Sequence, residues 1–267
     1  MGGGSSDAID HARLTRAGSI RMRLIAPQGP AAHLATTFFR LECDEPAIRD
    51  VQPSSIGIFA VQARGGGHIR FLDGRTDPGH PVMLVTPTEA ASTFEVAGPW
   101  RVFGAMLSPV GWAGLTGRCA KREGNRLHPA GAMLPPPVVA AGEAIRARYD
   151  SMSDEEASGL LSQALAAAAR PLPAEHVRFI VSIREWLASS LSPEIGGLPA
   201  RTGYSARQVQ RLAERYFGLT PKGLARKYRA LRAAVSLSRP EITADEIAAR
   251  GSPQRAVRDI CARAPWA

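Results

Sequence analysis

The residues best suited to recognising another molecule lie together between Ser205 and Arg229. This stretch, SARQVQRLAERYFGLTPKGLARKYR, contains seven Arg and Lys residues. On a helix that turns about 100° per residue, its apolar side chains gather on one side. Arg207, Gln210 and Arg211 gather on the other side. Arg can donate two hydrogen bonds to guanine O6 and N7, and Gln can pair with adenine N6 and N7, so the pattern favours contact with base edges in a major groove.

The segment before this stretch supports the same interpretation. Gly203 can adopt a left-handed turn, and Ser205 is a good N-cap residue. A helix, a turn containing Gly and a second helix that displays Arg and Gln form a helix-turn-helix pattern. An ordinary amphipathic helix with a solvated polar face remains the alternative. In either case we expect Val209 and Leu212 to be buried and Gln210 to be exposed.

A second unit of the same kind follows near the end of the sequence. Thr243 and Glu246 have the spacing of a capping box, and Ser252 precedes Pro253 at the first position of another predicted helix. Between the two units, the sequence PKGLARKYRALRAAVSL predicts one long helix. The polar side of the last predicted helix carries Gln254, Arg255 and Arg258.

The two units resemble the DNA-binding domain of AraC-type transcriptional regulators, in which one long helix bridges two helix-turn-helix units. The motif S-x-R-Q-V-Q-R-L-x-E-R-Y-F-G-L-T-P-K matches the first recognition helix, and SPQRAVRDI fits the second. The resemblance implies double-stranded DNA as the partner and recognition helices at residues 205–216 and 252–263. It implies base contacts by Arg207, Gln210, Arg211, Gln254, Arg255 and Arg258, and phosphate contacts by Ser205, Lys222, Arg226 and Lys227.

Two features depart from the family's pattern. Pro199 stands where Ala is usual, and because Pro inside a helix costs about 3 kcal/mol, we expect a short first helix that starts near Leu198. In the second unit, the turn ARGSPQ lacks the usual Gly and aromatic residue. An interaction protein with a degenerate helix-turn-helix, which no longer binds DNA specifically, therefore stays open as an alternative.

The N-terminal part has a different character. Short segments rich in Ile, Val, Thr and Phe fill residues 19 to about 108, and they are separated by predicted turns such as RGGGH and AGP. After Pro109 the pattern changes to a short helix that ends at Gly117. The sequence RVFGAMLSPVGWAGLTG in this part resembles the sensor region of one branch of the family. We therefore expect an α+β protein of two domains: a β-rich, cupin-like barrel or sandwich followed by helices, and an all-α double helix-turn-helix domain.

The expected boundaries follow the changes in pattern. Residues 1–18 are expected to form a flexible tail, residues 19–117 the sensor-like domain, residues 118–173 a helical connection, and residues 174–267 the DNA-binding domain. Ser153 and Glu156 form a capping box that starts a helix within the connection. Beyond residue 174, helical spacing is shown by Val177, Ile180, Val181, Arg184 and Leu187.

Composition limits the functional classes. The formal net charge of +9 and the pI of about 10.3 favour a polyanionic partner, although Arg can also serve solubility alone. The three Cys residues form no CxxC pair, which fits a reducing compartment. The first residues contain no apolar h-region, so we expect no secretory signal peptide, and no apolar run approaches the roughly 18 residues that a membrane helix needs. We expect a cytoplasmic protein.

An enzyme is the remaining rival class. The six His residues form no HxH pair, and no GxSxG motif is present, so we expect no catalytic residues, metal or cofactor. A metal-free barrel enzyme is the less favoured alternative. The regulator interpretation adds a small-molecule effector, RNA polymerase and a second copy of the chain as expected partners. An apolar barrel pocket, or simply a core, is predicted from Phe38, Phe59, Phe71, Phe94, Trp100 and Phe103.

Overall fold

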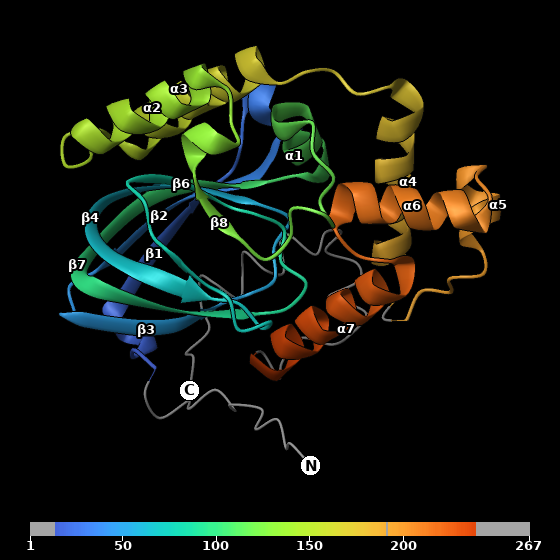
Figure 1. Cartoon of the computed structure of the whole chain (residues 1–267), viewed down its shortest axis with the longest axis horizontal. Helices are drawn as coiled ribbons and strands as arrows, with labels where there is room; N and C mark the ends of the chain where they lie inside the picture. The colour runs from blue at the N-terminus through green and yellow to red at the C-terminus, as the bar shows by residue number, and fades with distance from the viewer. Residues whose placement is uncertain (1–13, 191, 239–267) are drawn as a thin grey trace.

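The structure is a computed structural model of the chain, in which residues 14–190 and 192–238 are described. The second predicted helix-turn-helix unit, with Gln254, Arg255 and Arg258, lies outside these ranges. The chain forms a β-sheet with helices on one face, followed by a separate group of helices (Figure 1). The α+β class that the sequence predicts is confirmed.

One antiparallel sheet of eight strands forms from the N-terminal part. Along it the strand order is β1-β2-β7-β4-β6-β8, while β3 pairs with β7 and β5 pairs with β4. This path does not close on itself, so the expected barrel does not form. The strands are β1 (Ile20–Ile25), β2 (Ala35–Cys43), β3 (Ala47–Gln52), β4 (Ile58–Arg70), β5 (Thr76–Pro78), β6 (Val82–Val85), β7 (Ser92–Leu107) and β8 (Leu127–Pro129).

Two turns predicted at glycines are wrong, because both segments continue as strand. β4 passes through the RGGGH segment with shifts in register, and β7 passes through the AGP segment. A Cβ atom on Gly67 would lie 1.9 Å from the carbonyl oxygen of Glu95, and one on Gly98 would lie 1.8 Å from that of Glu45. These glycines therefore permit close approach of a neighbouring backbone instead of a chain reversal.

Three helices cover one face of the sheet: α1 (Pro109–Thr116), α2 (Pro136–Ala147) and α3 (Asp154–Ala168). The Ser153 capping box that the sequence predicts is present at the start of α3. Their apolar faces share one core with Phe38, Phe59 and Phe103 of the sheet. Residues 118–173 thus supply two covering helices, and they also supply β8 to the sheet. Three short 3-10 helices lie at Ala17–Ser19, Gly29–Ala31 and Ala130–Ala132.

A buried arginine attaches the α2–α3 turn to the sheet. Arg40 of β2 is 4% exposed, and its Nε lies 2.5 Å from Oδ1 of Asp154. Its two terminal nitrogens donate to the carbonyl oxygens of Tyr149 and Met152, at 3.1 and 2.8 Å. The guanidinium also lies 4.5 Å from the ring centre of Tyr149, and burial raises the pKa of that phenol to about 12. Arg40 is thus held by charge, hydrogen bonds and ring contact together.

The second group of helices consists of α4 (Ala174–Ser189), α5 (Leu198–Thr202), α6 (Ala206–Phe217) and α7 (Pro221–Ser238). They share an apolar core to which Ala113 of α1 also contributes. The stripe predicted for α4 is partly wrong, because Val181 is 44% exposed. The buried residues of α4 are Phe179, Ile180, Ile183, Trp186 and Leu187.

Candidate nucleic-acid interface

The turn between α5 and α6 is built as the sequence predicts. α5 begins at Leu198 with Pro199 in its first turn, and it ends at Gly203, whose φ of 72° is left-handed. This confirms the short first helix. Ser205 then caps α6, and its Oγ accepts a hydrogen bond from the backbone N–H of Gln208. The Gln208 side chain accepts from the Ser205 N–H in return, at 3.0 Å, which completes a capping box.

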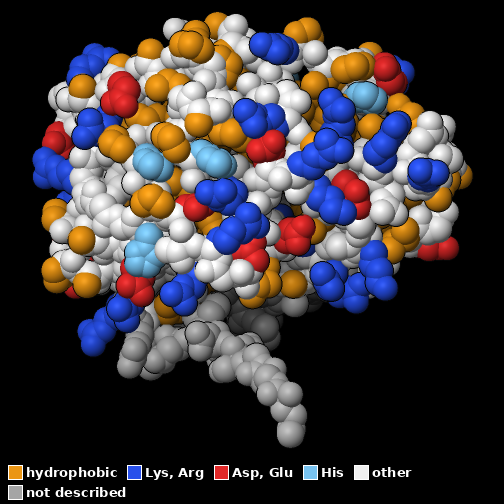
Figure 2. All heavy atoms as spheres, viewed as in Figure 1, with side chains coloured by type: hydrophobic (Ala, Val, Ile, Leu, Met, Phe, Trp, Pro, Cys, Tyr) orange, Lys and Arg blue, Asp and Glu red, His pale blue; other side chains and the backbone are white. Residues whose placement is uncertain are grey.

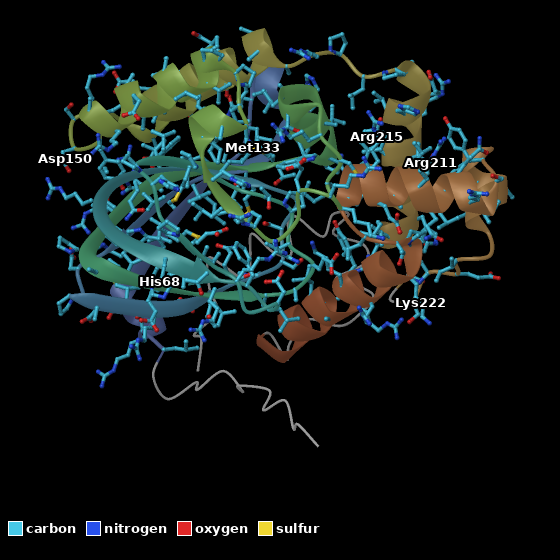
Figure 3. The ribbon with its side chains drawn as sticks, in the orientation of Figure 1. His68, Met133, Asp150, Arg211, Arg215 and Lys222 are labelled. Carbon is cyan, nitrogen blue, oxygen red and sulfur yellow. The ribbon has the colours of Figure 1, made fainter. Side chains whose placement is uncertain are left out.

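The predicted register of α6 is confirmed. Val209 is 2% exposed and Leu212 is 4% exposed, so both pack in the helical core. Arg207, Gln210 and Arg211 are all exposed on the opposite face. Figure 3 shows Arg211 and Arg215 along α6 and Lys222 at the start of α7, far from Asp150 at the other end of the molecule.

The expected phosphate contacts divide into three kinds. Lys222 and Arg226 are exposed in the first turns of α7, close in sequence to the end of α6. The Ser205 hydroxyl is engaged in its capping box, since it also donates to Oε1 of Gln208 at 2.9 Å. Lys227 does not lie with the exposed cations, because its half-buried side chain lines a cavity between α7 and the sheet.

Arg232 is likewise turned inward. Only 5% of this residue is exposed, and its terminal nitrogens donate to the carbonyl oxygens of Leu187 and Ser190. These carbonyls belong to the last turn of α4, where no intrahelical donor remains for them. Arg232 therefore joins the C-terminal end of α4 to α7 and is not available to a phosphate.

Most of the net positive charge belongs to one part of the chain. Residues 174–238 contain eleven Lys and Arg against four Glu, a net charge of +7, whereas residues 1–173 contain 17 basic and 16 acidic residues. Figure 2 shows basic side chains gathered over the region of α4 to α7. A concentration of positive charge on one group of helices is the electrostatic property expected of a nucleic-acid-binding surface.

The C-terminal end of α6 is fixed to the sheet-bearing part of the chain. The backbone N–H groups of Ala120 and Lys121 donate to the carbonyl oxygens of Arg215 and Glu214, at 2.9 and 3.1 Å. Lys121 Nζ also lies 2.7 Å from Oε1 of Glu214, and this hydrogen bond keeps the pKa of the Glu214 carboxyl below its usual value. The N-terminal half of α6, with Arg207 and Arg211, remains exposed.

This attachment is a feature that sequence reasoning missed. Lys121 and Glu214 are 93 positions apart, and no local pattern links them. The sequence predicts Ser205 as the N-cap, but its pairing with Gln208 was missed, although the S-x-x-Q spacing is a local signal of a capping box.

The sheet encloses a cavity of its own, called here the sheet cavity, of about 110 Å³. Of the six aromatic residues predicted to line a pocket, Phe94 and Trp100 line it, and Phe71 packs in the apolar cluster around it. Phe38, Phe59 and Phe103 pack in the core beneath the helices. Gln62 also lines the cavity. Its Nε2 and the Trp100 Nε1 are buried and have no hydrogen-bond partner among the described residues.

The described part of the chain holds neither a candidate metal cluster nor a candidate membrane-spanning helix. No cluster of three or more His, Cys, Asp or Glu side chains suited to a metal ion lies within residues 14–190 and 192–238. No helix in the same ranges combines the length and apolar character needed to cross a bilayer.

Comparisons with known proteins identify a weakly similar solved structure and no matching family model or curated protein. No protein-family model matches it, and no curated protein matches it. Among solved structures, it is similar to the AraC-like transcriptional activator CuxR, with 13% sequence identity and a TM-score of 0.35. The match covers 82% of this chain and 88% of that one. A similarity this low establishes no family, so the candidate interface depends on the residues of this chain.

Proposed function

We propose that the protein is a sequence-specific DNA-binding regulator of transcription, of the AraC type, with α6 as a recognition helix in a major groove. The observation that carries the proposal is the two-sided character of α6. Val209 and Leu212 are buried, and Arg207, Gln210 and Arg211 are exposed, in a part of the chain with a net charge of +7. The major groove is about 12 Å wide and admits a helix of this kind.

The exposed residues have complementary tasks in this proposal. Arg207 and Arg211 lie four positions apart, about 6 Å along the helix axis, so each can reach a different base pair. Gln210 donates from Nε2 to Oε1 of Glu214 at 3.2 Å. An amide nitrogen carries two hydrogens, so Gln210 keeps one donor and its carbonyl oxygen for an adenine.

The cations of α7 set the position of the helix on the duplex. Lys222 and Arg226 are exposed near the start of α7, where they can contact phosphates beside the groove. Gln254, Arg255 and Arg258 would supply a second set of contacts in the next segment of groove. A small-molecule effector, contact with RNA polymerase and homodimer formation belong to the same proposal, with the sheet as the sensor-like part.

Two other functions compete with this one. An interaction protein would use the same cations against an acidic protein surface, and a metal-free enzyme would use the sheet cavity. Neither predicts that one exposed Arg of α6 determines a preference for one base pair. DNA selection from a random pool, followed by substitution, therefore separates the three.

The deciding experiment is Arg211→Ala in the full chain. We expect the affinity for the selected DNA to fall by about 1–3 kcal/mol, with relaxed preference at one base pair. Arg64→Ala is the matched control, because it removes the same charge from β4, where Arg64 pairs with Asp150 at 2.6 Å. Unchanged affinity and preference in the Arg211 variant would show that α6 is not the recognition helix.

A further inference from the structure

Glu214 of α6 joins the proposed base reader Gln210 to Lys121, a residue that lies 93 positions before Glu214 in the chain. Its Oε1 atom accepts two hydrogen bonds, from Nζ of Lys121 at 2.7 Å and from Nε2 of Gln210 at 3.2 Å. One carboxylate oxygen therefore contacts both a side chain of the exposed face of α6 and a cation of the sheet-bearing part.

The segment that carries Lys121 is held in place at both of its ends. The indole Nε1 of the buried Trp112 donates to the carbonyl oxygen of Arg118 at 3.1 Å. The backbone N–H of Arg126 donates to Oγ1 of Thr86, directly after β6, at 2.9 Å. Backbone hydrogen bonds connect the same segment to the last turn of α6. Lys121 therefore approaches α6 from a support whose place relative to the sheet is set by several bonds.

The charge of Glu214 determines which end of the Gln210 amide faces it. The hydrogen bond from Lys121 keeps the pKa of the Glu214 carboxyl below its usual value, so this group is ionised at neutral pH. An ionised carboxylate has no hydrogen to donate, and only the nitrogen end of the amide can pair with it. A free, exposed Gln side chain would present its nitrogen and oxygen in either order, because its last torsion is roughly two-fold.

The order of these two atoms matters for reading an adenine. In the major groove, adenine N7 accepts a hydrogen bond and adenine N6 donates one, so the Gln nitrogen must meet N7 and the Gln oxygen must meet N6. An amide that is already held in one order loses less rotational freedom when it binds. It also fits poorly against a base whose donor and acceptor are placed differently.

The contact with Lys121 makes the pair of Glu214 and Gln210 persistent. Two exposed side chains four positions apart on a helix stabilise each other only weakly. Glu214 is half-buried, and its Oε1 is also bonded to an ammonium group that is supported from outside α6. A charge-assisted hydrogen bond of this kind is stronger than a neutral one, so it limits the movement of the carboxylate that Gln210 contacts.

We propose that Glu214 and Lys121 are positioning residues for base recognition, which hold the Gln210 amide in the one orientation that reads adenine. The inference rests on the proposed function, because it concerns how α6 discriminates between bases. Neither positioning residue has to touch the DNA. One ion pair thus gives the sheet-bearing part a share in the sequence preference of the recognition helix.

The network is tested first without DNA, by NMR spectroscopy of the Gln210 side-chain amide in the full chain. Gln210→Ala identifies the signal by removing it. We expect Lys121→Met to shift this signal, because the carboxylate that the amide contacts is released. Arg122→Met is the matched control, since Arg122 is the next cation in sequence and is exposed, with no ion pair within the described ranges. A signal that does not respond to Lys121→Met would overturn the inference.

Base preference is then measured by selection from a random DNA pool, followed by competition binding. Gln210→Ala should reduce discrimination at one base pair about tenfold, which identifies the base pair that it reads. Lys121→Met and Glu214→Ala should each reduce discrimination at that same base pair by at least about threefold, and leave the base pair of Arg211 unchanged. Arg122→Met should keep the wild-type preference at both.

A merely structural role of the two residues predicts a different pattern. Loss of support for α6 as a whole would weaken discrimination at the Arg211 base pair as much as at the Gln210 base pair, and this result would overturn the inference. Combining Lys121→Met with Gln210→Ala gives a second test. Once Gln210 is absent, Lys121→Met should cause no further loss at that base pair, and a further loss of the original size would contradict positioning through Gln210.

The same measurements separate a failure of this inference from a failure of the proposed function. If α6 does not read DNA, Arg211→Ala and Gln210→Ala both leave every preference unchanged, and the inference falls with the proposed function. If Arg211→Ala changes the preference but Lys121→Met does not, only the inference is wrong. Lys121→Met alters an exposed side chain, so it decides the matter even where Glu214→Ala fails to fold.

Discussion

The sheet region, residues 14–173, and the helical region, residues 174–238, use arginine in different ways. In the sheet region most arginines lie against carboxylates, as in Arg21 with Asp44 at 2.8 Å and Arg126 with Asp77 at 2.8 Å. In the helical region Arg201 pairs with Glu185 at 3.0 Å, but no described carboxylate pairs with Arg207 or Arg211. The four Glu residues there are too few for eleven cations.

Arginines with and without a carboxylate partner differ in how available their charge is to another molecule. An arginine that already faces a carboxylate contributes to the folded state and attracts other anions weakly. An exposed arginine without such a partner adds little to stability, but its charge remains available to a polyanion. The comparison therefore predicts that loss of the buried Arg40 costs folding free energy in the sheet region, whereas loss of an exposed Arg costs binding free energy in the helical region.

The largest expected effect belongs to Arg40→Ala. Removing this buried side chain leaves the carbonyl oxygens of Tyr149 and Met152 without their donor and removes one of the two arginines at Asp154. We expect the free energy of unfolding to fall by about 3–5 kcal/mol in urea titrations. Arg211→Ala should change it by less than about 0.5 kcal/mol. Similar losses in both variants would remove the contrast between the regions.

Leu212→Ala tests whether the helical region depends on the apolar face of α6. The side chain is 4% exposed in the helical core, so its truncation should cost about 2–5 kcal/mol of stability. Gln210→Ala, two positions away on the exposed face, is the control and should be nearly neutral. Urea unfolding followed by circular dichroism measures both, and an unchanged midpoint for Leu212→Ala would contradict the register of α6.

The salt dependence of DNA binding tests the availability of the exposed charges. Each phosphate contact that is lost should reduce the slope of log K against log salt by roughly 0.9. We expect this reduction for Lys222→Ala and none for Arg64→Ala. Equal slopes in the two variants would mean that total charge, and not the position of the cations, governs binding.

The same measurement extends to the second helix-turn-helix unit, outside the described residues. We expect Arg258→Ala to weaken binding to the selected DNA and to random DNA alike, with a shallower slope. A loss confined to the selected DNA would instead show that the second unit reads sequence.

The last prediction concerns the pH dependence of stability. Burial lowers the pKa of Lys227 to about 8, whereas an unfolded Lys titrates near 10.4. Between these values the unfolded chain binds more protons than the folded chain, so this residue makes stability rise with pH from about 8 to about 10. Lys227→Met should lack that increment, and Lys222→Met should keep it. Urea titrations at both ends of this pH range compare the wild type with the two variants.

Sequence reasoning succeeded where a few neighbouring residues determine the structure. The start of α6 depends on Gly203 and Ser205, and its buried face depends on apolar residues one helical turn apart. The short α5 follows from Pro199, and the start of α3 from the Ser153 capping box. All of these depend on local backbone geometry and local hydrogen bonds. The sequence by itself therefore determined the two helices α5 and α6, the turn between them, and which side chains of α6 are exposed.

Sequence reasoning failed where a residue's role depends on what lies beside it in space. Gly67 and Gly98 can form a turn or permit close approach, and only the neighbouring backbone decides which. Lys222 and Lys227 lie on the same basic helix. Because α7 packs against the sheet, Lys222 is exposed, whereas the side chain of Lys227 lines a cavity. Lys121 meets Glu214 across 93 positions. Tertiary structure alone decided these contacts, because helical periodicity sets which residues share a face but not which face meets another part of the chain.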